Sequence, residues 1–208
     1  AEPGPIGRGH DSAPNRHGET AWVRCFLAVP IAEPGLAAVR RLQSELRERV
    51  AGVGWARPET LHLTVHFFGQ IDEDRAATAL SDVTPIVERT PPFDVVLDRL
   101  GAFPEKGIPR VLWLGPAREV PQLTALALEC RVALAAAGFE VEDRRYHAHC
   151  TLGRPRHNFR AEARAAWAAA SDGDRVNATF TASRVVLYES QPASGGARYT
   201  ERSSLAFA

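Results

Sequence analysis

Hydrophobic and polar positions follow two different periods along the chain, which predicts a mixture of strands and helices. Apolar or alternating runs typical of strands occupy residues 22–31, 61–69, 93–103, 110–115, 147–154, 184–190 and 197–207. Apolar residues at three- and four-residue steps predict helices over 35–51, 72–89, 120–137 and around 160–170. Gly138 suits the position just after the third of these helices. A turn at Gly195 and Gly196 predicts a C-terminal hairpin.

The fold class follows from the kind of strand that the pattern contains. Many of the strands alternate apolar with polar residues, which favours sheets with one covered face over a doubly wound sheet. A His-x-Thr strand followed by a helix occurs once in each half, which suggests an internal duplication. The sequence therefore predicts an α+β fold.

The chain divides into a short irregular segment and one long ordered region. Residues 1–20 contain Gly, Pro and polar residues without apolar periodicity, and we expect a disordered or processed tail. Residues 21–208 are expected to form a single domain. With 45% apolar residues in 208, the chain can bury a core without disulfides or a structural metal.

Charge and cysteine content narrow the function classes. Lys plus Arg equals Asp plus Glu at 25 each, which argues against a wide polyanion-binding surface but allows a small basic pocket. Lys106 is the only lysine, so the remaining cations are arginines, which suit phosphate contacts. Three cysteines without a CxxC pair favour reduced thiols. No run approaches the ~18 apolar residues of a membrane span, and we expect a cytoplasmic protein that does not bind membranes.

Two tetrapeptides carry the candidate chemistry, HLTV at 62–65 and HCTL at 149–152. Alternate residues of a strand share a face, so each segment presents one imidazole and one hydroxyl together. In-line displacement at a phosphodiester needs a proton acceptor on one side of phosphorus and a proton donor on the other. Histidine can take either role near neutral pH, and threonine hydroxyls can donate to the non-bridging oxygens. This chemistry requires no metal and no cofactor.

A structural interpretation competes with this one. A single His-x-Thr in a strand is more often a half-buried structural pair, and His10, Asp11 and Ser12 match the loose pattern within the first twenty residues. Two such segments in different halves, each followed by an apolar residue, favour a functional site.

The segments LHLTVHFFG and YHAHCTLGR resemble the paired HxTx signatures of the 2H phosphoesterase superfamily, specifically its LigT-like RNA 2′,3′-cyclic phosphodiesterase branch. Further segments are similar to that branch in order and spacing. They are RCFLAVPI, PRVLWLG and VVLYESQPASGGARYT. The resemblance extends from Trp22 to the C-terminus.

The resemblance implies a bilobal α+β fold, with two pseudo-symmetric lobes that each carry an antiparallel-rich sheet, helices outside and a central cleft between them. It implies that His62 is the proton donor and His149 the proton acceptor, with Thr64 and Thr151 on the phosphate oxygens. The implied substrates are RNA ends or short oligonucleotides with a 2′,3′-cyclic phosphate, which is opened to a 2′-phosphomonoester. It implies no protein partner, and we expect a monomer.

Two positions that flank the second motif qualify the resemblance. Arg154 matches an arginine that often closes this motif and would bind substrate. Strand alternation would place its side chain opposite that of His149, so a bend at Gly153 is needed. Ala148 stands where the family commonly has proline.

A rival interpretation comes from two further histidines. Strand alternation predicts that His66 shares a face with His62, and His147 with His149, and four converging histidines could bind zinc. No carboxylate or cysteine lies at a ligand spacing with them, so we expect both to line the pocket rim or stay exposed. Cys150 should point away from the site, which disfavours a Cys-His nucleophile.

Other functions remain open at this point. The alternatives are a phosphodiesterase for another 2′-linked or cyclic nucleotide, a non-catalytic module that binds RNA ends, and a metallohydrolase. Trp113 is expected in the core. Aromatic residues near the motifs could stack on a base, and the candidates are Trp55, Phe67, Phe68, Tyr146 and Tyr199.

Overall fold

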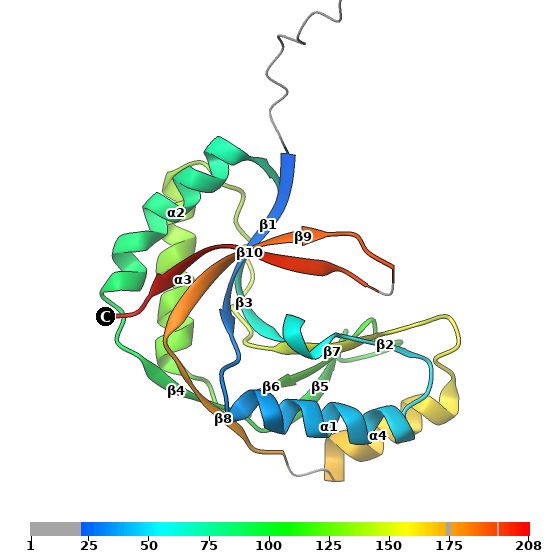
Figure 1. Ribbon diagram of the computed structural model, residues 1–208. Coiled ribbons are helices and arrows are strands. Elements are labelled where there is room, and N and C mark those ends of the chain that lie inside the picture. Colours follow the sequence, from blue (N-terminus) through cyan, green and yellow to red (C-terminus); the bar gives the residue numbers. More distant parts are fainter. Residues whose placement is uncertain (1–21, 174–175, 195) are drawn as a thin grey trace, which may run out of the picture.

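The computed structural model describes residues 22–173, 176–194 and 196–208. The predicted tail at 1–20 and Gly195 of the predicted turn lie outside these residues. Two four-stranded antiparallel sheets and a two-stranded ribbon form the framework (Figure 1). In sheet order, sheet A contains β10 (Arg198–Ala206), β9 (Arg184–Gln191), β1 (Trp22–Pro30) and β3 (His62–Asp72). Sheet B contains β2 (Val53–Trp55), β7 (Cys150–Pro155), β6 (Val111–Gly115) and β5 (Arg99–Phe103).

The helices divide between the two sheets. Helices α2 (Glu73–Glu88) and α3 (Pro121–Ala136) pack against each other and against sheet A (Figure 1). Helices α1 (Gly35–Arg49) and α4 (Ala161–Gly173) lie beside sheet B, where α1 contacts β2 and α4 contacts β5. The four predicted helices are confirmed, and so is the α+β fold with antiparallel sheets covered by helices.

Local sequence signals set the helix ends. Asp72 precedes α2, and its carboxylate accepts a hydrogen bond of 2.7 Å from the backbone N–H of Arg75. Pro121 begins α3, where its missing N–H costs nothing. Gly138 follows α3 with φ +74°, a conformation that favours glycine, as the sequence predicts.

The predicted strand over 93–103 is wrong as a single element. Residues 93–97 form β4 (Phe93–Leu97), which pairs with β8 (Ala178–Ala182) in the ribbon, whereas β5 pairs with β6 in sheet B. Two successive exposed residues, Asp98 and Arg99, interrupt the alternation between the strands. The Asp98 carboxylate accepts a hydrogen bond from the N–H of Ala117 and fixes the break. Strands β2 and β8 were not predicted. The three residues of β2 are too few to show a period, whereas the five residues of β8 alternate between buried and exposed.

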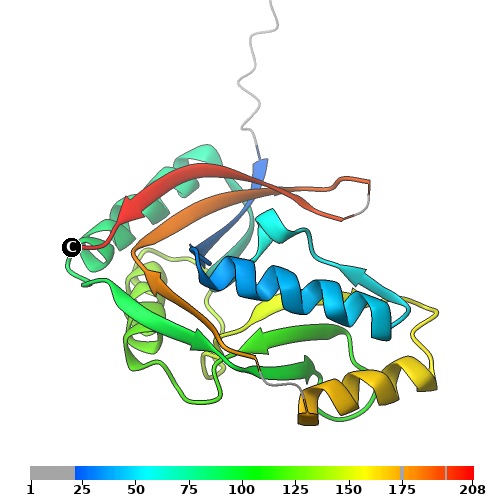
Figure 2. The same ribbon diagram turned by 60° about the horizontal axis from the view of Figure 1, so that its bottom comes forward.

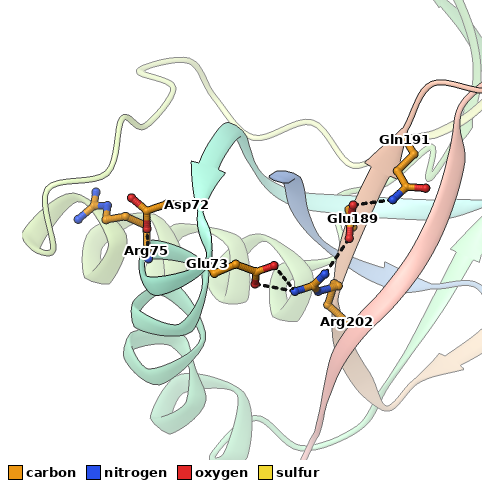
Figure 3. Close-up of polar contacts among 6 residues, drawn as sticks. All are labelled: Asp72, Glu73, Arg75, Glu189, Gln191 and Arg202. Atoms are coloured by element: carbon orange, nitrogen blue, oxygen red, sulfur yellow. Dashed lines mark hydrogen bonds and ion pairs between the residues drawn. The ribbon is translucent and has the colours of Figure 1, made fainter. Parts of the chain in front are cut away.

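The C-terminal hairpin of β9 and β10 is confirmed, and it is anchored at both ends. Arg202 stands at a one-residue register shift in β10, and it pairs with Glu73 of α2 and with Glu189 of β9 (Figure 3). The hairpin projects beyond sheet A toward the segment between β2 and β3, which contains the 3-10 turn η1 (Pro58–Thr60) (Figure 2). There Arg57 donates to the carbonyl of Ser194 at 3.1 Å.

Packing buries the three cysteines, and all three are unpaired thiols. None of the helices in the described ranges is long and apolar enough to cross a membrane.

Candidate active site

His62 is the first residue of β3, on the edge strand of sheet A. Its Nδ1 lies 2.6 Å from the carbonyl oxygen of Thr60. A carbonyl can only accept, so this nitrogen carries the proton and donates it. The ring rests against Phe26, with centroids 4.8 Å apart, and against the edge of Tyr199 at 5.5 Å.

His149 lies immediately before β7 in sheet B, whereas the strand that we predicted over 147–154 contained it. Its Nδ1 lies 2.8 Å from the carbonyl oxygen of His147, again two residues upstream. Its ring meets Phe103 edge-on, with centroids 5.1 Å apart and planes at 90°.

Both histidines are therefore held in the same tautomer by the same local device. A proton fixed on Nδ1 leaves the lone pair on Nε2, and no group of the described residues bonds either Nε2. Both rings are half-buried, as are the side chains of Thr64 and Thr151. Each segment thus presents one free imidazole nitrogen and one hydroxyl that solvent can reach.

The two motif segments meet at their beginnings, although they belong to different sheets. The backbone of His62 lies close enough to the Cys150 thiol to oppose the rise that burial causes in its pKa. The hydroxyl of Tyr146, in the approach to the second motif, donates to the Thr64 carbonyl at 3.0 Å. A charge on His149 lowers the pKa of His62, so the imidazoles lie within electrostatic reach of each other.

Each motif strand contains a β-bulge just after its threonine. In β3 the register shift leaves Val65 as the extra residue, next to the carbonyl that Tyr146 binds. In β7 the extra residue is Leu152. The Leu152 carbonyl accepts from the Nε2 of buried Gln43 at 2.9 Å and from the N–H of Ala56 at 2.8 Å. A side chain from another element therefore supports each bulge.

The bulge in β7 supplies the irregularity that we expected at Gly153. Arg154 is exposed beyond it. Its charge adds to the lowering of the His149 pKa by burial and opposes the rise that burial causes in the pKa of Tyr199. The Arg154 side chain therefore lies near one residue of each sheet. Gly153 itself is in close contact with β2, since a Cβ there would stand 2.6 Å from Val53 Cγ1.

The prediction for His66 is wrong. The extra residue Val65 reverses the alternation, so His66 faces the helices and not the side of His62. It is 7% exposed, and its ring lies 4.6 Å from that of Phe68. The four histidines do not converge, and no cluster of three or more potential metal ligands occurs within the described ranges.

His147 is exposed, as expected, and stays on the same side as His149. Its ring contacts those of Phe103 and Trp113 at 5.2 and 5.0 Å. Trp113 is buried, as predicted, but it pairs with Thr151 across the strands and so lies on the site face of sheet B.

Desolvation lowers the pKa of both imidazoles. The pKa of His62 falls to about 4, mainly by burial, although the Thr60 carbonyl raises it. Burial also lowers the pKa of His149, and the hydrogen bond to the His147 carbonyl opposes this effect. Both are neutral at pH 7 in the free protein. Burial raises the pKa of Cys150 to about 12, so it remains a thiol. Its side chain lies in the core and faces away from the site, as expected.

The aromatic candidates separate into structural and accessible residues. Tyr146 is used in the link between the motifs, and Phe68 packs edge-on against Phe139. Trp55 packs against the core. Phe67 is exposed and Tyr199 is half-buried beside His62, so these two are available to a ligand.

Sequence reasoning did not assign Gln43, Phe26 or Phe103 to the site, although all three help to build it. Gln43 left a signal, because it is a polar residue within the buried stripe of α1, and buried polar groups have partners. Phe103 left none, because only the fold brings β5 beside His149.

Comparisons with known proteins identify the family. Residues 29–113 match the model of the family described as "LigT like Phosphoesterase". An RNA 2′,3′-cyclic phosphodiesterase of Archaeoglobus fulgidus is 36% identical over 135 residues, which cover 64% of this chain and 72% of the relative. A Thermotoga maritima protein of the same name is 30% identical over 132 residues, which cover 64% and 70%.

Solved structures agree in fold. Escherichia coli LigT in complex with 3′-AMP superimposes with a TM-score of 0.73 at 24% identity, over 90% of this chain and 99% of LigT. A Thermus thermophilus protein gives a TM-score of 0.73 at 23% identity, over 88% and 97% of the two chains. With two HxTx segments meeting across two antiparallel sheets, and with relatives of this similarity, the chain belongs to the LigT-like phosphoesterase family of the 2H superfamily.

Proposed function

We propose that this protein hydrolyses 2′,3′-cyclic phosphate ends of RNA to 2′-phosphomonoesters, by metal-independent acid–base catalysis with two histidines. The observation that carries the proposal is the shared orientation of His62 and His149. Each donates Nδ1–H to the carbonyl two residues upstream and leaves Nε2 unbonded. The names of the relatives support the substrate class.

The reaction needs one proton acceptor and one proton donor. Nε2 of His149 accepts a proton from water as the water oxygen forms a bond to phosphorus. The bond from phosphorus to the 3′ oxygen breaks, and Nε2 of His62 protonates that oxygen. Exchange with solvent then returns each imidazole to its starting state. The division of roles follows the resemblance of the two motifs to those of the family.

Because the pKa of His62 is low, the imidazole becomes a proton donor only when substrate is bound. At neutral pH the free imidazole carries no proton on Nε2. A cyclic phosphate is an anion, and an opposite charge within a few ångströms raises the pKa of histidine. Bound substrate therefore favours the protonated donor that the reaction requires.

Three further side chains suit the negative charge of the phosphate. Thr64 and Thr151 place half-buried hydroxyls beside the two histidines and would donate to the non-bridging oxygens. Arg154 has no carboxylate partner within the described residues, so its guanidinium remains available for the same phosphate.

The direct test uses an oligoribonucleotide with a 2′,3′-cyclic phosphate end, incubated with the full chain in EDTA. We expect turnover and a 2′-phosphomonoester as product, identified by ³¹P NMR. Loss of activity in EDTA that added metal restores would contradict the metal-independent mechanism. Binding without turnover would indicate the RNA-end binding module, and turnover only of another cyclic or 2′,5′-linked nucleotide would replace the substrate.

The setting of the reaction is part of the proposal. The three buried thiols suit a reducing compartment, and we expect the protein to act in the cytoplasm, as a monomer and without a cofactor or protein partner.

A further inference from the structure

A strip of exposed side chains continues from His62 along the same face of sheet A. Residues 22, 24 and 26 of β1 share this face, because residues 23 and 25 point into the core. Phe26 contacts His62, whereas Trp22 at the far end is 65% exposed. Phe67 of β3 pairs with Phe26 and is 44% exposed. We call Trp22, Arg24 and Phe67 the β1–β3 strip.

Two bulges in β3 give Phe67 this position. The first, at Val65, turns the alternation so that His66 faces the helices and Phe67 faces the site. The second makes Phe68 an extra residue, which packs with His66 and Phe139. Of the three successive ring side chains His66, Phe67 and Phe68, only Phe67 therefore lies on the site face of sheet A.

Arg24 adds positive charge to the strip. Its guanidinium carbon lies 4.9 Å from the centre of the Phe67 ring, and its charge also reaches Tyr199 beside His62. No carboxylate of the described residues pairs with it. An unpaired arginine between two exposed aromatic rings has the composition of a single-stranded nucleic acid site, where bases stack on aromatics and cations contact phosphates.

We propose that the β1–β3 strip binds the nucleotides upstream of the cyclic phosphate, so that the preferred substrate is an oligonucleotide and not a cyclic mononucleotide. The inference rests on the proposed function. A 2′,3′-cyclic phosphate ends its strand, so any further nucleotide lies on the 5′ side. From residue 22 to residue 26 the strand spans about 13 Å, enough for more than one stacked base. Phe67 and Trp22 stack on bases, and Arg24 contacts a phosphate between them.

The experiment compares kcat/KM for a cyclic mononucleotide with that for a five-nucleotide RNA ending in 2′,3′-cyclic phosphate. We expect the wild type to prefer the pentanucleotide. Phe67→Ala and Trp22→Ala should each lower kcat/KM on the pentanucleotide roughly tenfold and change the mononucleotide value less than about twofold. Leu128→Ala, at 44% exposure on α3, is the matched control and should change neither.

Arg24→Gln gives a separate readout. Loss of one phosphate contact should reduce the slope of log kcat/KM against log salt by about 0.7 for the pentanucleotide. An unchanged slope would contradict the phosphate contact.

Several outcomes would overturn the strip while leaving the proposed function intact. One is equal kcat/KM of the wild type on the mononucleotide and the pentanucleotide. The others are a loss of kcat/KM in Phe67→Ala that is equal on both substrates, or no loss of kcat/KM on either. Failure of the wild type to cleave the mononucleotide and the pentanucleotide would instead reject the proposed function. Fluorescence binding of a pentanucleotide with a 2′-phosphate end, with and without Phe67→Ala, then tests the strip independently, and equal binding would reject it.

Discussion

The two HxTx segments share one hydrogen-bonding device but differ in their surroundings. His62 lies on a sheet edge among three aromatic rings, and its pKa falls to about 4. His149 precedes its strand, and burial, His147 and two arginines lower its pKa. The nitrogen presented is the same, and the neighbours differ. Backbone geometry therefore fixes which nitrogen each imidazole leaves unbonded, while packing and charge give the two rings different surroundings.

The largest expected effect comes from removing either imidazole. His62→Ala and His149→Ala should each lower kcat/KM on a cyclic-phosphate RNA by about 10²- to 10⁴-fold, since general acid and base catalysis each contribute on this scale. His66→Gln is the matched control, because this third histidine of the same region faces the helices, and it should keep activity within a few-fold. If either alanine variant kept more than a tenth of the activity, that histidine would not transfer a proton.

The next effect tests the supports of the two bulges. Gln43→Leu removes the donor to the carbonyls of Ala56 and Leu152, so the free energy of unfolding should fall by about 1–3 kcal/mol. Tyr146→Phe removes a single hydrogen bond and should cost about 1 kcal/mol. Urea denaturation measures both, with exposed Gln70→Leu as a control that changes stability by less than about 0.5 kcal/mol. Equal stability of Gln43→Leu and the wild type would show that the second bulge needs no support.

The smallest expected effect is a shift of the pH profile of kcat/KM to acidic pH. The acceptor must be deprotonated and the donor protonated, so kcat/KM of the free enzyme falls on both sides of a maximum. Burial lowers both histidine pKa values below the ordinary 6.5, that of His62 to about 4. The profile is centred midway between the two pKa values, one at about 4 and the other below 6.5, so the maximum of kcat/KM should lie below about pH 5.3. The kcat profile should lie at higher pH, because bound phosphate raises both pKa values. A maximum of kcat/KM above pH 7 would contradict these shifts.

The sequence predicts what depends on local pattern, and it fails where one extra residue changes a strand. Periodicity predicted the four helices, a glycine turn with alternating residues predicted the hairpin, and a repeated tetrapeptide pattern revealed the paired motifs. His66 was misplaced because alternation assumes a regular strand, and the bulge at Val65 depends on pairing with β1. The same limit made the position of Arg154 conditional on a bend. Partners such as Gln43 and Tyr146 come from distant segments, so only the fold identifies what they bind.

The roles of the two histidines are tested most directly by changing the leaving atom. In a cyclic phosphate whose bridging 3′ oxygen is replaced by sulfur, the leaving thiolate needs no proton. On this substrate His62→Ala should regain most of its lost rate relative to the wild type, whereas His149→Ala should remain as slow as before. Rescue of His149→Ala in place of His62→Ala, or of neither variant, would contradict the assignment of His62 as donor and His149 as acceptor.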